Sequence, residues 1–261
     1  MIVTTGYEPS SATQAHAEEL ARTLGLPLVP RKEENLTTLR QRHQTDGIIV
    51  VSAKGARLET TGAPPFFFHP NTAAFRIKRL ERGDNDTMLS ACQIQPGDEV
   101  LDATLGLGAD AIVFAHGVGE SGRVVGCESK PLVAALTADG LRHYEIEQTN
   151  LQSAMRRVEV ISRHHLDVLR ELPDGSFDVV YFDPMFTATV EASSGIQPLR
   201  QFANESELTY EAVEQAMRVA RRRVVLKEGQ EGNLSQRFGF TPYRRRMGQV
   251  TYSYREARGG E

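Results

Sequence analysis

VLDATLGLGADA, residues 100–111, is the stretch that decides the fold of this chain. Its first residues are apolar and typical of a short buried strand, and an apolar helix follows from Ala111 onward. Gly106 and Gly108 stand between the two, where glycine lets the backbone bend sharply and lie close to a ligand. Asp102 ends the strand, at the edge where open α/β sheets hold their ligands. The stretch therefore predicts a strand–loop–helix unit that binds a nucleotide-like cofactor.

Two cofactors compete for this loop. Its G-x-G-x-x-A pattern fits the dinucleotide fingerprint, and Glu128 follows at about the distance at which that fingerprint places an acid. However, a pyrophosphate at a helix start avoids nearby anions, and Asp102 and Asp110 flank the loop. S-adenosylmethionine carries a positive sulfonium and a positive amino group, which the same carboxylates attract. Charge therefore favours S-adenosylmethionine, although Asp110 is alternatively a first-turn acid that complements the helix dipole.

Four further strands, each preceded by a helix or turn, are expected at residues 123–128, 158–161, 177–182 and 224–227. Glu128 ends the first of them, where a carboxylate can take both hydroxyls of a ribose; a solvent-facing Glu is the alternative. Asp167 follows the next strand, where it can accept a hydrogen bond from an adenine amine or cap a helix over 168–172. The candidate cofactor-binding residues are Asp102, Thr104, Gly106, Gly108, Asp110, Glu128, Ser129 and Asp167.

The motif Asp-Pro-Met-Phe at residues 183–186 ends the strand over 177–182. An exocyclic purine amine is a poor nucleophile, so an enzyme that methylates it must hold both N–H groups and the ring. The carboxylate of Asp183, the carbonyl of Pro184 and the ring of Phe186 supply those contacts, and Pro184 makes the turn rigid. These three residues are the predicted catalytic residues, acting mainly through positioning and electrostatics. A proline turn whose acid caps a neighbour is the structural alternative.

Length and composition indicate an ordinary globular protein of 261 residues, with 40% hydrophobic and 25% charged residues and a net charge of −4. We expect a small α/β accessory domain over 1–62 and a cofactor-binding domain over 63–261 that ends in an antiparallel hairpin. No membrane span or signal peptide is predicted, and the two cysteines suggest a reduced, cytoplasmic protein. No metal is predicted, because His164 and His165 lack metal-ligand spacing.

Residues 63–84 combine Phe66, Phe67 and Phe68 with basic side chains. Such a stretch can stack and hold RNA bases; alternatively, Phe66 and Phe68 point into the core and the basic residues face water. The negative net charge disfavours a protein that coats nucleic acid but leaves local basic patches possible. Candidates for a basic surface are Arg76, Lys78, Arg79, Arg218, Arg221, Arg222, Arg244, Arg245 and Arg246, with 221–223 alternatively a solvated helix end. Residues 187–204 are expected to form a mobile loop, and residues 84–94 a helix capped by Asp84 or Asn85.

Three segments resemble one known family: DATLGLGADA at 102–111, VAAL at 133–136 with DGL at 139–141, and YFDPMF at 181–186. They are similar to the bacterial 16S ribosomal RNA guanine-N2-methyltransferases, and the similarity covers roughly residues 66–230. The resemblance implies a class I, Rossmann-like S-adenosylmethionine fold behind a small N-terminal domain. It also implies S-adenosylmethionine at Asp102, Gly106, Gly108 and Glu128, and the target amine at residues 183–186.

The leading interpretation is an S-adenosylmethionine-dependent N-methyltransferase that acts on a guanine amine in small-subunit ribosomal RNA. A second interpretation keeps the enzyme and changes the acceptor to an amine of a small molecule, a protein or a DNA base. A third is a binding module without catalysis, and a fourth is an NAD-dependent oxidoreductase. The sequence does not indicate the oligomeric state.

Overall fold

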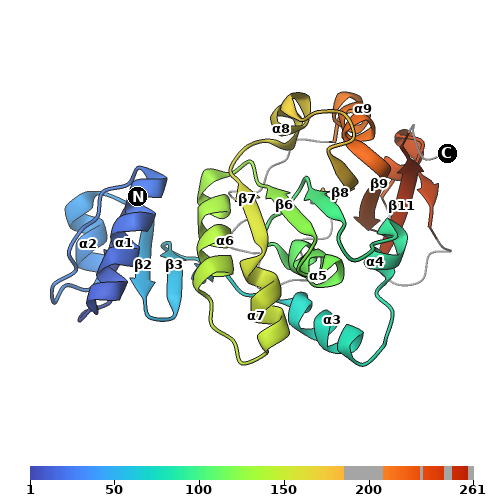
Figure 1. Ribbon diagram of the computed structural model, residues 1–261. Helices are drawn as coiled ribbons and strands as arrows, with labels where there is room; N and C mark the ends of the chain where they lie inside the picture. The colour runs from blue at the N-terminus through green and yellow to red at the C-terminus, as the bar shows by residue number, and fades with distance from the viewer. Residues whose placement is uncertain (185–207, 230–231, 244–248, 258–261) are drawn as a thin grey trace.

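The chain forms two β-sheets, seen in a computed structural model that describes residues 1–184, 208–229, 232–243 and 249–257 (Figure 1). The smaller sheet has the order β1-β2-β3-β4, and the larger has the order β10-β11-β9-β8-β5-β6-β7. Figure 1 shows the smaller sheet and its helices, in blue, at one end of the molecule beside helix α6.

The smaller sheet is built mostly from the first 59 residues. Its strands are β1 (Ile2–Thr5), β2 (Ile48–Ser52), β3 (Gly55–Glu59) and β4 (Phe66–Phe67). Helices α1 (Ser11–Leu24) and α2 (Leu36–His43) connect β1 to its parallel neighbour β2. Ser10 and Asn35 cap these helices by accepting hydrogen bonds from the Thr13 and Thr38 amides. The predicted accessory unit is thus α/β, and its sheet takes β4 from beyond residue 62; the division at 62/63 stays a prediction.

The larger sheet has five parallel strands followed by an antiparallel addition. The parallel strands are β5 (Glu99–Asp102), β6 (Arg123–Cys127), β7 (Val158–Ile161), β8 (Phe177–Phe182) and β9 (Ala220–Gly229). Strand β11 (Val250–Glu256) lies antiparallel between β9 and β10 (Thr241–Pro242). This order confirms the predicted class I, Rossmann-like sheet with a C-terminal antiparallel hairpin.

Two apolar layers cover the larger sheet. The side chain of Val100 belongs to the cluster formed with α3 (Thr72–Glu81), α4 (Thr87–Cys92), α5 (Ala109–Val118) and α7 (Thr149–Arg156). Its neighbour Leu101 faces the other layer, formed with α8 (His165–Glu171), α9 (Tyr210–Val219) and α10 (Leu234–Arg237). This alternation is what a strand buried on both faces requires. Helix α6 (Pro131–His143) packs against the small unit through Leu132, Val133 and Leu136.

Several predicted boundaries were wrong because other residues cap the helices. The helix expected over 84–94 is α4, and Asp86 caps it instead of Asp84 or Asn85. The helix expected over 168–172 begins at His165 and is capped by His164, so Asp167 is not its cap. Residues 221–223 lie in β9 and do not form a helix end. The expected loop at 187–204 lies outside the described residues.

The phenylalanine run confirms the core alternative in part. Phe66 and Phe68 are buried, at 2% and 4% exposure, whereas Phe67 is half exposed. No described helix combines the length and the apolar character that a membrane-spanning segment needs.

Candidate active site

The carboxyl ends of β5, β6 and β8 meet around the glycine loop. The Ala103 amide donates to the carbonyl of Tyr181 at 2.8 Å, and the Leu105 amide donates to that of Cys127 at 2.9 Å. The loop after β5 is therefore fixed to its neighbours on both sides. The Asp183 amide in turn donates to Thr104 Oγ1 at 2.6 Å. The two motifs that the sequence singled out, about 80 residues apart, thus lie directly against each other.

The glycine loop leaves space above it. Gly106 and Gly108 have φ of +53° and +75°, which L side chains rarely adopt. A Cβ atom added at Gly106 would meet no atom of the described residues within 4 Å, so the loop surface there is open. The Gly106 carbonyl accepts a hydrogen bond from Thr137 Oγ1 of α6 at 2.9 Å. The loop is thus fixed to α6 by this hydrogen bond, and the surface at Gly106 remains accessible.

Glu128 lies at the end of β6, against the loop. Its carboxylate accepts the amides of Gly106 at 3.2 Å and Lys130 at 2.8 Å, and Ser129 Oγ lies 3.5 Å away. Burial raises the pKa of Glu128 although these hydrogen bonds oppose the shift. The structure places Glu128 and Ser129 beside the loop, and their contact with a cofactor stays a prediction.

Asp102 is 2% exposed at the end of β5. The Thr104 amide donates to its Oδ1 at 3.1 Å. Burial, with the nearby charge of Asp110, raises the pKa of Asp102 to about 8. None of the ion pairs between described residues involves Asp102, and a buried acid of this kind is a favourable partner for a cationic ligand.

Asp110 opens α5, but its oxygens are already engaged. Its Oδ2 accepts the Lys227 ammonium and the Tyr181 hydroxyl, both at 2.8 Å, and its Oδ1 accepts Arg76 at 2.5 Å. Although burial opposes it, the two cations hold the pKa of Asp110 well below its usual range. Asp110 is therefore a first-turn acid of α5, as the alternative interpretation held, and it is part of an ion-pair network. Its contact with the cofactor stays a prediction.

Asp183 shares that network through Lys227. Its Oδ2 lies 2.7 Å from Lys227 Nζ, so one ammonium joins the acids that begin α5 and end β8. The Asp183 side chain is 34% exposed, more than its partners. Burial and Asp110 raise its pKa, and Lys227 opposes that shift. Pro184 follows it, partly buried, whereas Phe186 lies outside the described residues.

The described cluster contains more acids than bases. Arg76 also binds both oxygens of Asp86, at 2.7 and 2.8 Å. Four acidic side chains, Asp86, Asp102, Asp110 and Asp183, therefore lie with two cations, Arg76 and Lys227. The pKa of about 8 leaves Asp102 mostly protonated at pH 7 in the cofactor-free protein, and a ligand with positive charge would favour its ionised form.

Asp167 is less closely connected. It lies in the first turn of α8, its side chain is 54% exposed, and the nearest cation is Arg170 at 3.6 Å. Next to it, burial lowers the pKa of His165 to about 4, which leaves that imidazole neutral. A hydrogen bond from Asp167 to an adenine amine stays a prediction.

Sequence reasoning missed the importance of Arg76, Tyr181 and Lys227. Arg76 was assigned to a basic surface, which was wrong because its guanidinium is directed at Asp86 and Asp110. Lys227 stands near the carboxyl end of a parallel strand, which is the available signal in the sequence. Tyr181 stands between apolar residues near the end of β8, where its ring indicates a core position and nothing in the sequence indicates a role for its hydroxyl.

The remaining predicted basic surface is largely neutralised by ion pairs. Arg218 pairs with Asp174 at 2.6 Å, Arg221 with Glu99 at 2.7 Å, and Arg222 with Asp98. Lys78 and Arg79 are exposed on α3, where Arg79 pairs with Asp84. Residues 244–246 lie outside the described residues.

Comparison with known proteins gives this architecture a family. A family model described as "Putative SAM-dependent methyltransferase" matches residues 33–237. The chain is 41% identical to uncharacterized protein YpiP of Bacillus subtilis (strain 168), covering 96% of this chain and 97% of the relative. It is 30% identical to ribosomal RNA small subunit methyltransferase J of Dechloromonas aromatica (strain RCB), covering 70% of this chain and 77% of the relative.

A solved structure shows the same fold. The crystal structure of the SAM-dependent methyltransferase NGO1261 from Neisseria gonorrhoeae superposes with a TM-score of 0.67 at 19% identity. The match covers 100% of this chain and 98% of that one, so the small N-terminal unit and the larger sheet are both included.

Proposed function

The chain belongs to the family of S-adenosylmethionine-dependent methyltransferases, and from that premise we propose that it methylates N2 of a guanine in small-subunit ribosomal RNA. Asp183 carries the proposal, because its amide binds Thr104 in the cofactor loop while its carboxylate remains partly exposed. The names of the more distant relatives support the choice of RNA. Such an enzyme would act in the cytoplasm, where small subunits assemble.

S-adenosylmethionine supplies an electrophilic methyl group on a sulfonium, and the residues around the loop fit that cofactor. The open face of Gly106 leaves room for it. Among the described residues, no cationic side chain donates a hydrogen bond to Asp102 or Glu128. We assign Glu128 to the ribose hydroxyls and Asp102 to the positive end, with Thr104, Gly108, Ser129 and Asp167 around them. Asp110 is assigned a positioning role instead, through Lys227.

The acceptor amine is assigned to the end of β8. Among the described residues, Lys227 binds one oxygen of Asp183, and we assign the other oxygen to an N–H of the amine. The second N–H is assigned to the carbonyl of Pro184, and contact with the base is assigned to Phe186, which lies outside the described residues. Holding both hydrogens directs the nitrogen lone pair toward the methyl group, so positioning supplies most of the rate. The proton leaves late, to Asp183 or to water.

Lys227 is a positioning residue in this scheme. It holds Asp183 in one orientation and connects it to Asp110, which Arg76 and Tyr181 also bind. Four side chains from four elements, α3, α5, β8 and β9, therefore form the network that holds the Asp183 carboxylate through Lys227. Because these side chains are already in position, they do not need to reorient in the transition state.

Helix α3 offers an RNA contact beside the site. Its Arg76 is joined to Asp110, so the helix lies next to the cluster. On its exposed side, Phe75 is 65% exposed and the Arg79 guanidinium lies 5.9 Å from the Phe75 ring. An exposed ring with neighbouring cations can stack on a base and contact phosphate. We assign Phe75, Lys78 and Arg79 to RNA, and residues 1–62 to an accessory role.

A methyl-transfer assay tests the proposal. Purified protein and labelled S-adenosylmethionine are incubated with small ribosomal subunits, protein-free RNA, bulk protein, DNA and a metabolite extract. Label is expected in N2-methylguanosine from the ribosomal fraction, and Asp183→Asn should abolish it. Asp174→Asn, which changes an exposed acid just before β8, is the matched control and should keep activity. Label in another fraction would transfer the proposal to that acceptor, and cofactor binding without label in any fraction would indicate a binding module.

A further inference from the structure

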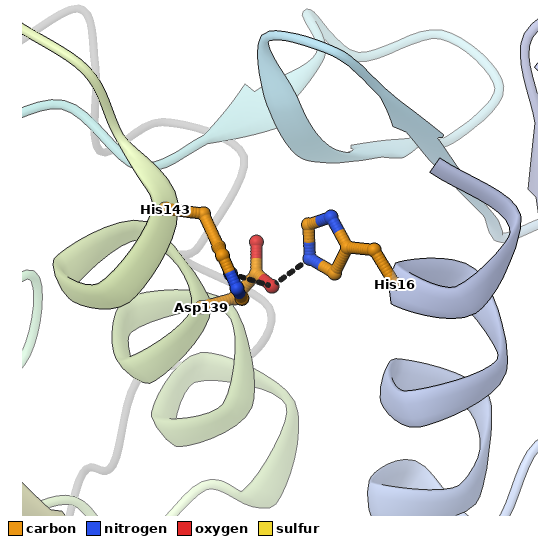
Figure 2. A group of neighbouring side chains, drawn as sticks. All are labelled: His16, Asp139 and His143. Carbon is orange, nitrogen blue, oxygen red and sulfur yellow. Dashed lines mark hydrogen bonds and ion pairs between the residues drawn. The ribbon is translucent and has the colours of Figure 1, made fainter. Parts of the chain in front are cut away.

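A second cluster of chemically reactive side chains lies away from the methyl-transfer site, where the small unit meets α6. Figure 2 shows His16 of α1 directed toward Asp139 and His143 of α6. Three potential ligand atoms, one from each residue, all lie within 4.8 Å of one another. These three residues take no part in the ion pairs of the active site.

We propose that His16, Asp139 and His143 form a binding site for a divalent transition metal, with Zn²⁺ as the best-suited ion. Two imidazoles and one carboxylate are ligands that zinc takes in proteins. Three protein ligands leave a fourth position for water.

The distances allow coordination with small side-chain movements. Zinc bonds of about 2.1 Å in a tetrahedral site place neighbouring ligand atoms about 3.4 Å apart. His143 Nδ1 already lies 3.2 Å from Asp139 Oδ1. His16 Nε2 contacts the same oxygen more closely through a hydrogen bond. A metal ion would replace the proton in that contact and lengthen it, as metal binding to imidazole requires.

Helix geometry supports the arrangement. Asp139 and His143 are four residues apart on α6, so they project from one face of that helix. His16 comes from α1, and its ring centroid lies 4.2 Å from that of His143. The site therefore combines one helical ligand pair with a third ligand that is 123 residues distant in sequence. This separation explains why spacing along the chain did not reveal it.

The cluster is partly protected and yet accessible. The side-chain exposures are 6% for Asp139, 14% for His16 and 36% for His143. Asp139 also lines a cavity of about 290 Å³ between α6 and the small sheet, which provides a route for an ion. The two cysteines are buried elsewhere, at 0% and 1% exposure, and do not compete for the metal.

A bound ion would join the two units. Helices α1 and α6 already meet through apolar side chains and through the exposed Arg142–Glu19 pair at 2.8 Å. A metal held from both helices adds a link that the unfolded chain lacks, so it stabilises the folded protein. The site is independent of methyl transfer.

Zinc binding by the untagged, chelator-treated full chain tests the proposal. Calorimetric titration and elemental analysis should give one Zn²⁺ per chain, and Co²⁺ should show visible ligand-field bands. Zinc should also raise the melting temperature. His16→Gln and His143→Gln should each weaken binding at least about tenfold and remove that rise. His43→Gln, which changes an exposed histidine of α2, is the matched control and should behave as the wild type.

Asp139→Asn separates coordination from hydrogen bonding. Asparagine still offers an oxygen to both imidazoles, so the fold is expected to persist, while loss of the anionic ligand should weaken zinc binding. The proposal is overturned if the wild-type chain takes up no stoichiometric zinc, or if His16→Gln and His143→Gln bind it as the wild type does. In that case the three residues are only a hydrogen-bonded contact between helices.

Discussion

The two halves of the active-site edge treat their carboxylates differently. At the ends of β5 and β6, Asp102 and Glu128 accept backbone amides, and Ser129 Oγ also contacts Glu128. At the end of β8 and the start of α5, Asp183 and Asp110 share Lys227. In the first half, a cationic cofactor would favour the ionised form of Asp102, whose pKa is about 8 in the free protein. In the second half the carboxylates are ion-paired, so Asp183 is fixed for hydrogen bonding to the acceptor amine.

The largest expected effect is on the acceptor side. Asp183→Asn should lower kcat by about 10³-fold, because a correctly placed carboxylate that aligns the amine and receives its proton contributes on that scale. The affinity for S-adenosylhomocysteine should stay within about threefold of the wild type. Single-turnover methylation and calorimetry measure the two quantities. Equal losses in both would mean that the two halves do not act separately.

Lys227 should give the next largest effect. Lys227→Met removes the ammonium that orients Asp183, and we expect a fall in kcat of about 10²-fold with a smaller change in cofactor affinity. Lys227→Arg keeps the charge and should restore part of the rate. Because the substitution also leaves Asp110 with one cation fewer, thermal melts should accompany the kinetics. A Lys227→Met enzyme with normal kcat would remove Lys227 from the scheme.

On the cofactor side, Glu128→Gln should raise the Kd for S-adenosylmethionine about 10- to 30-fold, because two charge-assisted hydrogen bonds to ribose hydroxyls weaken. The rate at saturating cofactor should change little. This result would be the mirror image of the Asp183 variant. A lower kcat with unchanged Kd would contradict the assignment of Glu128.

Much of this comparison could be predicted from the sequence, because the strand ends and glycine turn are local signals. The register that brings Asp183 to Thr104 follows from parallel strands that end at one edge. Lys227 and Arg76 could not be assigned in the same way. Both side chains bind Asp110, which is 34 residues from Arg76 and 117 residues from Lys227 along the chain. Whether side chains so far apart in sequence point toward each other depends on how the helices and strands pack.

Helix ends were predicted less well for a related reason. Several polar residues precede each helix, and only the local backbone decides which of them caps it. Asp86 rather than Asp84 caps α4, and Asp86 also binds Arg76, so one residue serves the helix and the site. His16 shows the same limit for the proposed metal site, since its partners lie on another helix.

The proposed RNA contact on α3 should show a smaller effect than the acids. Phe75→Ala should raise the KM for ribosomal substrate about 5- to 10-fold, because it removes a stacking surface, and should leave kcat and cofactor affinity unchanged. Tyr210→Ala, which removes another exposed ring on α9, is the matched control. Unchanged KM in Phe75→Ala would place the RNA on another surface.

Asp102 should make the stability of the cofactor-free protein depend on pH. Its folded pKa of about 8 lies above the usual unfolded value, so the folded state binds the extra proton. The contribution of Asp102 to the free energy of unfolding is therefore larger at about pH 6 than at pH 8, and it falls by about 2 kcal/mol between these two values. Asp102→Asn should flatten that fall, as urea unfolding at several pH values would show. An equally steep fall in the variant would refute the assignment.

The most direct test of the central claim is mass spectrometry of nucleosides from small-subunit ribosomal RNA. Cells with the gene, without it, and complemented with wild-type or Asp183→Asn protein are compared. We predict that one N2-methylguanosine per small subunit disappears on deletion, returns with the wild-type protein and does not return with Asp183→Asn. An unchanged nucleoside profile on deletion, or full recovery with Asp183→Asn, would contradict the account.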